Sequence, residues 1–87
     1  MAVYVDQSKY AYGRMIMCHM MADTLDELHL MAERIGIRRE HFQEHAYYPH
    51  YDICKSKREI AVALGAIEIR SQDLIRKFRH RRTGEKK

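Results

Sequence analysis

Two matching helix signals constrain the fold of this chain more than any other feature of its sequence. Thr24 and Glu27 form a capping box, in which the threonine hydroxyl accepts a backbone N–H of the first helical turn, and Gly36 favours the backbone conformation that ends a helix. The same signal recurs between Ser56 and Gly65. Each signal bounds a segment of about ten residues, and short apolar segments lie on either side. This arrangement predicts strands and helices in alternation.

The segments around the two helices have strand character. Residues that are β-branched, aromatic or apolar dominate four stretches, namely 2–6, 14–22, 50–53 and 66–70. A third helix is expected from Ser71 to about His80. The expected order is strand, strand, helix, strand, helix, strand, helix. The chain is therefore predicted to be a small single-domain α/β protein with a sheet of about four strands that is at least partly parallel.

Two polar segments interrupt this pattern. Residues 7–12 are expected to form a loop, and residues 37–46 a short helical turn or a loop. Residues 1–70 are expected to form the compact domain, and residues 71–87 a basic C-terminal helix with a frayed tail. The buried side of the second helix is expected to consist of Ile60, Ala61, Ala63 and Leu64.

Length and composition limit the class of protein. The chain has 87 residues, of which 46% are hydrophobic. A domain of this size buries only about 60–65% of its unfolded surface, so a thin core is expected, and a homodimer would add buried area. No apolar run is long enough to span a bilayer and no secretory signal opens the chain, which predicts a cytoplasmic protein that does not enter a membrane. Cys18 and Cys54 are then expected to be reduced, buried thiols.

Positive charge is concentrated at the C-terminal end. Residues 70–87 contain eight basic and two acidic residues, a net charge of +6, whereas the rest of the chain contains eight basic and ten acidic residues. Such a run favours contact with the phosphates of nucleic acid, here through Arg76, Lys77, Arg79, Arg81 and Arg82. The alternative is a solvated tail that contributes only to solubility.

A group of polar residues surrounds the third predicted strand. His50 and Asp52 are two residues apart and therefore share one strand face, and Asp6 ends the first strand. If these strands are parallel neighbours, the three side chains meet at one edge of the sheet, where two carboxylates and an imidazole can bind a divalent metal. The alternative is that Asp52 caps a turn and His50 is an ordinary surface residue.

Two further clusters complete the predicted pocket. Lys57 and Arg58 follow the predicted helix start at Ser56, where backbone N–H groups and cations attract phosphate. Arg14 lies at the entrance of the second strand, and His19, within it, is a candidate metal ligand or general base. The alternatives are a solvated helix start and a core histidine that a neighbouring side chain satisfies.

Four blocks of the sequence resemble a family of small bacterial and phage proteins, the domain of unknown function 4031. The blocks are Ala2–Asp6, Gly13–Met20 with Ala22 and Asp23, Pro49–Ile53, and Lys57 and Arg58 leading to Gly65 and Ala66. The resemblance covers about residues 2–70 and leaves the basic end outside. It implies a compact cytoplasmic protein of bacterial or phage origin, and it implies no activity, cofactor or catalytic residue.

These observations favour a small binding module for nucleic acid or for another phosphate-bearing ligand such as a nucleotide. Its polar pocket would be lined by Asp6, Arg14, His19, His50 and Asp52, with a phosphate held by Ser56, Lys57 and Arg58. One alternative is a metal-dependent phosphoesterase or nuclease that uses Asp6, His50 and Asp52 as metal ligands. Another is a phage or bacterial protein that binds a second protein through an exposed methionine and tyrosine surface.

Overall fold

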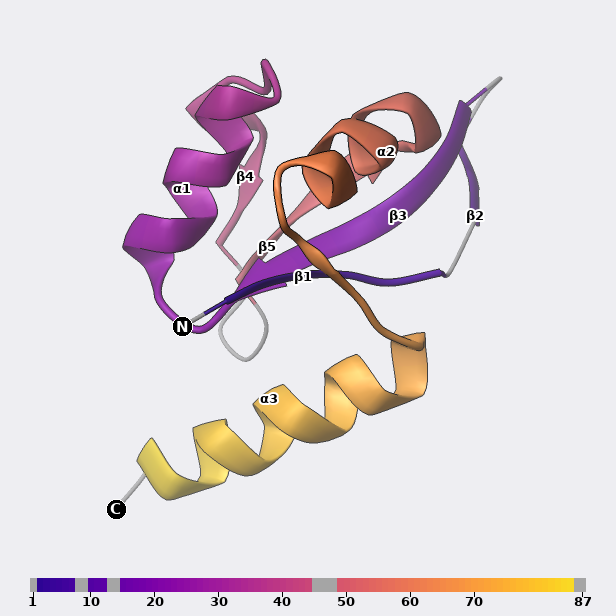
Figure 1. The fold of residues 1–87 in the computed structure, drawn as a ribbon. Helices are drawn as coiled ribbons and strands as arrows, with labels where there is room; N and C mark the ends of the chain where they lie inside the picture. Colours follow the sequence, from indigo (N-terminus) through magenta and orange to yellow (C-terminus); the bar gives the residue numbers. More distant parts are fainter. Residues whose placement is uncertain (1, 8–9, 13–14, 45–48, 86–87) are drawn as a thin grey trace.

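The computed structural model describes residues 2–7, 10–12, 15–44 and 49–85, and it describes only the backbone of residues 10–12, 15 and 79–85. The protein has three layers (Figure 1). Two helices, α1 (Leu25–Arg34) and α2 (Lys55–Ala63), lie on one face of a mixed sheet, and a third, α3 (Ser71–Glu85), lies on the other. The predicted α/β class and the order of the three helices are confirmed.

The described residues form a sheet of six strands, which are β1 (Val3–Val5), β2 (Tyr10–Tyr12), β3 (Met15–Ala22), β4 (Phe42–Gln43), β5 (His50–Cys54) and β6 (Ile67–Glu68). Their order is β4-β5-β3-β1-β6, with β2 paired to β3 outside this path, so β3 has a central place. The pair of β1 and β6 is parallel and the other pairs are antiparallel, so the sheet is partly parallel as predicted.

Two of the six strands were not predicted. β2 lies in the segment expected to be a loop, and β4 follows a short 3-10 helix, Arg39–His41, in the segment expected to be a helical turn or a loop. Each has only two or three residues, which is too short for an alternating pattern to show in a sequence. They form because they lie beside longer strands, β3 and β5, that offer free backbone groups.

The sheet separates two hydrophobic cores. The larger core lies between the sheet and the helices α1 and α2, and it contains Met20, Leu28 and Ile53. On the other face, Leu74 and Phe78 of α3 pack against Met21 and form a smaller core. The basic C-terminal helix is therefore packed on the sheet, and it continues to Glu85, past the end expected near His80.

The helix starts differ from each other in a way that the sequence did not indicate. At α1, Thr24 Oγ1 accepts the Glu27 N–H at 3.2 Å, so the predicted cap by the Thr24 hydroxyl is confirmed. The Glu27 carboxylate accepts from this hydroxyl at 2.9 Å, whereas a full capping box would direct it to the Thr24 N–H. At α2 the helix begins at Lys55 with Cys54 as its N-cap, and no side chain caps it. The predicted capping box at Ser56 is therefore wrong, since Ser56 already lies in the first turn.

The buried side of α2 also differs from the prediction. Ala61 is fully buried, but Ile60, Ala63 and Leu64 are exposed. The helix contacts the sheet mainly through Ala61 and the half-buried Val62. Both predicted helix-ending glycines are confirmed, because Gly36 and Gly65 adopt φ values of 84° and 112°. Within the described residues, no helix combines the length and the apolar character that crossing a membrane requires.

The two helix starts predict different costs of mutation. Thr24→Ala removes a formed cap and is expected to lower the free energy of unfolding by about 1 kcal/mol. Ser56→Ala is the matched control and is expected to change it by less than about 0.5 kcal/mol, because Ser56 caps no backbone group. Urea denaturation measures both, and equal losses would contradict this assignment.

Candidate functional site

Three strands meet at a row of polar side chains on the α3 face of the sheet. His19 on β3 is directly opposite Asp52 on β5. On the other side of β3, the register of β1 continues to Asp6, whose N–H donates to the His19 carbonyl at 3.0 Å. His19 therefore lies between two aspartates. The prediction had placed Asp6 and Asp52 on neighbouring parallel strands, but β3 runs between β1 and β5 and antiparallel to both.

Asp6 is the buried charged residue of the described chain, with 1% of its surface exposed. Its Oδ1 accepts the backbone N–H of His19 at 2.8 Å, a bond that the Asp6 carbonyl would accept in a regular ladder. The carbonyl instead accepts from Arg58 Nε at 2.8 Å. Asp6 Oδ2 lies 2.8 Å from His19 Nδ1 and accepts from the Ser71 hydroxyl at 3.2 Å. The carboxylate thus joins β1, β3 and the start of α3.

His50 and Asp52 lie beside His19 on the same face. His50 Nε2 is 3.3 Å from Asp52 Oδ1, and His19 Nε2 is 3.8 Å from the same oxygen. The two imidazole rings are 5.3 Å apart, edge to face. Asp52 Oδ1 is buried and accepts no hydrogen bond from the described residues. Its contacts are the two imidazole nitrogens, and a buried carboxylate oxygen that accepts no hydrogen bond is suited to bind a cation.

The three side chains together form a set of metal donors. One ligand atom from each of His19, His50 and Asp52 can be chosen so that no two atoms are more than 4.8 Å apart. The predicted set contained His50 and Asp52 but placed Asp6 in the third position. Asp6 does not join this set, because its two oxygens are bonded to His19 and Ser71. His19 is the third member of the donor set, in the place that had been predicted for Asp6.

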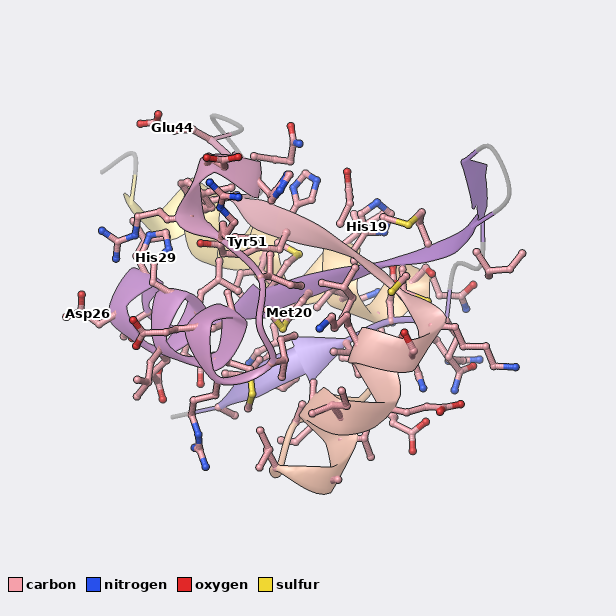
Figure 2. The ribbon with its side chains drawn as sticks, turned by 90° about the horizontal axis from the view of Figure 1, so that it is seen from above. His19, Met20, Asp26, His29, Glu44 and Tyr51 are labelled. Carbon is pink, nitrogen blue, oxygen red and sulfur yellow. The ribbon has the colours of Figure 1, made fainter. Side chains whose placement is uncertain are left out.

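The surroundings of His19 favour its charged form. The hydrogen bond from the ring to Asp6 raises the pKa of His19 above 6.5, partial burial opposes this, and the negative charges of Asp6 and Asp52 add to it. A different histidine, His29 on α1, lies near Tyr51, with its Nδ1 at 2.8 Å from the phenol oxygen. Burial lowers the pKa of His29, and the charge of Arg39 lowers it further. Figure 2 shows the two imidazoles well apart from each other.

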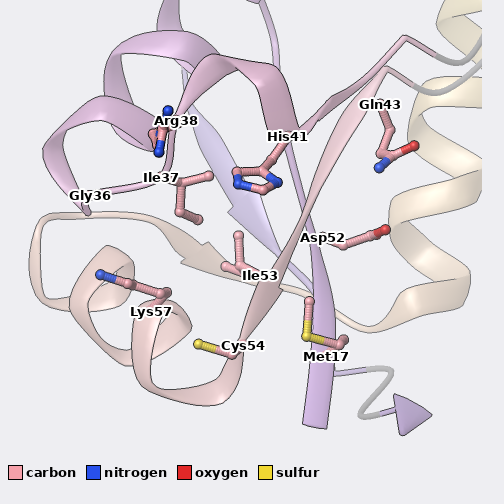
Figure 3. A pocket seen from close by; sticks show the side chains of 10 residues that line it. All are labelled: Met17, Gly36, Ile37, Arg38, His41, Gln43, Asp52, Ile53, Cys54 and Lys57. Atoms are coloured by element: carbon pink, nitrogen blue, oxygen red, sulfur yellow. The ribbon is translucent and has the colours of Figure 1, made fainter. Parts of the chain in front are cut away.

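A pocket of about 610 Å³ adjoins the metal donors at the outer edge of β5 (Figure 3). β4 pairs only with the first part of β5, so the chain from Gly36 to His41 curves around the remaining edge. In the close view, Asp52 and Gln43 point away from Lys57, toward the α3 side. The polar and charged lining residues are Arg38, His41, Gln43, Asp52 and Lys57.

The predicted phosphate-binding residues divide between this pocket and other contacts. Lys57 lines the pocket. Arg58 is engaged elsewhere, because its guanidinium bonds to the Asp6 carbonyl and, at 3.0 Å, to Glu68. Ser56 is exposed and lies 3.2 Å from Cys54 Sγ, and this contact lowers the pKa of the Cys54 thiol. Cys54 is only half-buried, unlike the fully buried Cys18. Arg14 lies outside the described residues.

The cations of α3 are only partly described. Arg76 Nη1 lies 3.9 Å from Asp73, and Lys77 Nζ lies 3.9 Å from Asp23 and above the ring of Tyr4. Both side chains are exposed, so these pairs are weak. The predicted contacts Arg79, Arg81 and Arg82 fall in the part of α3 whose side chains are not described.

Three polar residues of the pocket, Arg38, His41 and Gln43, were not predicted from the sequence to line it. Arg38 and Gln43 belong to the segment between α1 and β5, which carries no motif. Gln43 is placed by its pairing with His50, and Arg38 by the turn after Gly36. Neither contact follows from a local pattern, so only the tertiary structure could reveal them.

Residues 3–81 match the family described as "Protein of unknown function (DUF4031)", and the chain belongs to this family. The match extends past residue 70, where the sequence resemblance had been expected to end, and covers most of α3. No curated protein and no solved structure matches the chain. The family relationship confirms the resemblance and brings no activity with it.

The pKa of His19 is raised and that of His29 is lowered, so the two rings are expected to titrate on opposite sides of pH 6.5. By NMR, the His19 ring is expected to titrate above pH 6.5 and the His29 ring below it. His19 therefore stabilises the metal-free fold fully below pH 6.5, and this stabilisation is lost as the pH rises through the folded-state pKa. Asp6→Asn should lower the His19 midpoint and leave that of His29 unchanged. Coincident midpoints near 6.5 would show that these environments are absent in solution.

Proposed function

We propose that this member of the DUF4031 family binds a phosphate-bearing ligand, a nucleic acid or a nucleotide, in the pocket at the outer edge of β5. One observation carries the proposal: the wall of this pocket contains the cations Arg38 and Lys57 together with Asp52, which is one of the three metal donors. Cations beside a metal-binding carboxylate are the combination that phosphate sites use.

The two cations have complementary properties for this purpose. Lys57 provides a compact charge on α2, and its Nζ lies near the backbone of Gly36 on the opposite wall. Arg38 is exposed and its guanidinium lies 3.4 Å from the Glu40 carboxylate. Because both side chains are exposed, this ion pair is weak, and a phosphate can replace Glu40 as the partner of Arg38. His41, which also lines the pocket, adds a third donor. A phosphate group would accept hydrogen bonds from all three.

The C-terminal helix adds long-range attraction for a polyanion. Residues 70–87 carry a net charge of +6, and α3 lies on the sheet face that bears His19, His50 and Asp52. Positive charge on that side favours the approach of nucleic acid and makes binding dependent on salt. Phe78 of α3 is part of the smaller core, so truncation of the helix would also disturb the fold. Single substitutions of its basic residues therefore test the electrostatic attraction better than truncation does.

A second candidate function, a metal-dependent phosphoesterase or nuclease, is favoured by the donor set itself. Three protein donors leave a fourth coordination position for a water molecule or a substrate oxygen, which is the arrangement of catalytic zinc sites. His19, His50 and Asp52 would hold the metal, which would supply an activated water at the Asp52 edge of the pocket that Lys57 and Arg38 also line. Binding is the primary proposal, and hydrolysis is the additional step that this donor set favours.

Two other expectations from the sequence, that the protein forms a homodimer and that it binds a second protein, stay predictions.

Paired lysine variants test the binding site. Lys57→Ala is expected to weaken binding of a fluorescent single-stranded DNA or RNA oligonucleotide, or of a nucleotide, about 10-fold at low salt. Lys55→Ala removes the same charge from an exposed position in the same turn, and should weaken binding by less than about 3-fold. Fluorescence anisotropy over a salt series measures both. Equal effects of the two variants would rule out the pocket, and no binding by the unmodified protein would rule out the proposed function.

The hydrolase candidate has its own test. Asp52→Asn should abolish any cleavage of a phosphodiester substrate that depends on added divalent metal, because it removes a donor without changing shape. Asp26→Asn, an exposed position on α1, is the control and should leave cleavage unchanged. If the unmodified protein binds the oligonucleotide but cleaves none with any divalent metal, the hydrolase candidate fails and the binding proposal stands.

A further inference from the structure

We infer that His19, His50 and Asp52 form a mononuclear site for a first-row transition-metal dication of the zinc type, and that Asp6 positions His19 for it. This inference goes beyond the phosphate ligand, because it concerns a metal cofactor that would bind whether or not the pocket is filled. It is carried by the spacing of the donors, the hydrogen bonds of Asp6 and the buried oxygen of Asp52.

The spacing of the three donors is close to that of a coordination shell. Ligands about 2.0–2.1 Å from a tetrahedral metal lie about 3.3–3.4 Å from one another. His50 Nε2 and Asp52 Oδ1 are already 3.3 Å apart, and His19 Nε2 is 3.8 Å from the same oxygen. Since no two of the three ligand atoms need exceed 4.8 Å, small side-chain rotations would complete the shell. The backbone need not move, because pairing of β3 with β5 holds His19 opposite Asp52.

Asp6 selects the form of His19 that can bind a metal. Its Oδ2 lies 2.8 Å from His19 Nδ1, and a carboxylate only accepts, so Nδ1 carries a proton. In the neutral ring the lone pair is then on Nε2, the atom that faces Asp52. A carboxylate behind a metal-binding histidine is a general feature of protein metal sites, where it fixes both the tautomer and the orientation of the ring. Asp6 has this place, and it is held there by the His19 N–H and by Ser71.

The local charge also fits a dication. Asp6 and Asp52 carry two negative charges within one row of side chains, and Arg58, which contacts the Asp6 carbonyl, is paired with Glu68. With neutral imidazoles, a bound dication would balance the two carboxylates. It would also bind Asp52 Oδ1, which is buried and accepts no hydrogen bond from the described residues.

The donor types indicate which metals bind. Mg²⁺ and Ca²⁺ prefer shells made of oxygen, whereas imidazole nitrogens favour Zn²⁺ and its neighbours in the first row. Two of the three donors are imidazoles. The site is therefore expected to bind Zn²⁺ or Co²⁺ at least about 100-fold more tightly than Mg²⁺.

Metal binding to the chelator-treated full chain tests the site. Isothermal titration calorimetry at about pH 8 should show one Zn²⁺ per chain, and Co²⁺ should give a visible absorption band that Zn²⁺ removes. His19→Asn and Asp52→Asn should each abolish this binding, and Asp26→Asn, the exposed control, should retain it. Binding of Zn²⁺ no tighter than Mg²⁺, or unchanged binding in both cluster variants, would overturn the inference.

Asp6→Asn tests the positioning role. The amide keeps the shape of the carboxylate, but its NH₂ group donates to Nδ1 and so places the ring proton on Nε2. Zinc affinity should fall about 10–100-fold, and ¹⁵N NMR of the metal-free ring should show the change of tautomer. Ser71→Ala, which leaves the carboxylate in place, should keep the tautomer and weaken zinc binding less. A fully folded Asp6→Asn variant with the original tautomer and affinity would overturn this role, and so would a change of tautomer in Ser71→Ala.

The same samples separate the metal site from the ligand site. Oligonucleotide and nucleotide binding is measured before and after chelation. Zinc binding without any phosphate ligand would uphold the metal site and reject the proposed function. Phosphate binding that depends on Lys57 without tight zinc binding would do the reverse.

Discussion

The buried carboxylate of Asp6 is the interaction on which the rest of the site depends. An ionised group with 1% exposure is tolerated only where donors surround it, and here a backbone N–H, an imidazole and a hydroxyl do so. Because the side chain occupies the ladder position of its own carbonyl, that carbonyl is free to accept from Arg58 of α2. One residue thus fixes the end of β1, the ring of His19 and the first residue of α3, and links helices on both faces of the sheet.

The two faces of the sheet have different roles for a physical reason. Alternation along β3 directs Cys18 and Met20 into the main core under α1 and α2, and directs His19 and Met21 to the other face. There α3 covers Met21 with Leu74 and Phe78, while His19 remains about one-third exposed. The larger core contains most of the buried hydrophobic residues, and the partly covered face holds the polar row of His19, His50 and Asp52. A ligand could reach these groups without disturbing the main core.

Much of the fold could be predicted because its signals are local. The Thr24 cap, the glycine ends of two helices and the four longer strands all act within a few residues. The predictions failed where contacts between residues far apart in the sequence determine the local structure. β2 and β4 exist only beside β3 and β5. The Ser56 signal was overridden because the N-cap of α2 is Cys54, two residues earlier, at the end of β5. For the site, the sequence led to His50, Asp52 and His19, which the structure brings together, and to Lys57, which lines the pocket. Asp6 was expected to be a metal ligand and instead bonds to His19 and Ser71, and Arg58 was expected to bind phosphate and instead contacts Asp6 and Glu68.

The sequence by itself determined which residues share a strand face, since a strand turns its side chains by half a revolution at each residue. His50 and Asp52 therefore lie on one face whatever their neighbours are. Only the tertiary structure decided that β3 lies between β1 and β5, because strand pairing is a choice among distant partners that no local pattern encodes. That choice places His19 between Asp6 and Asp52. With this order, Asp6 holds the imidazole of His19, and Asp52 lies beside that ring with an oxygen that can bind a metal.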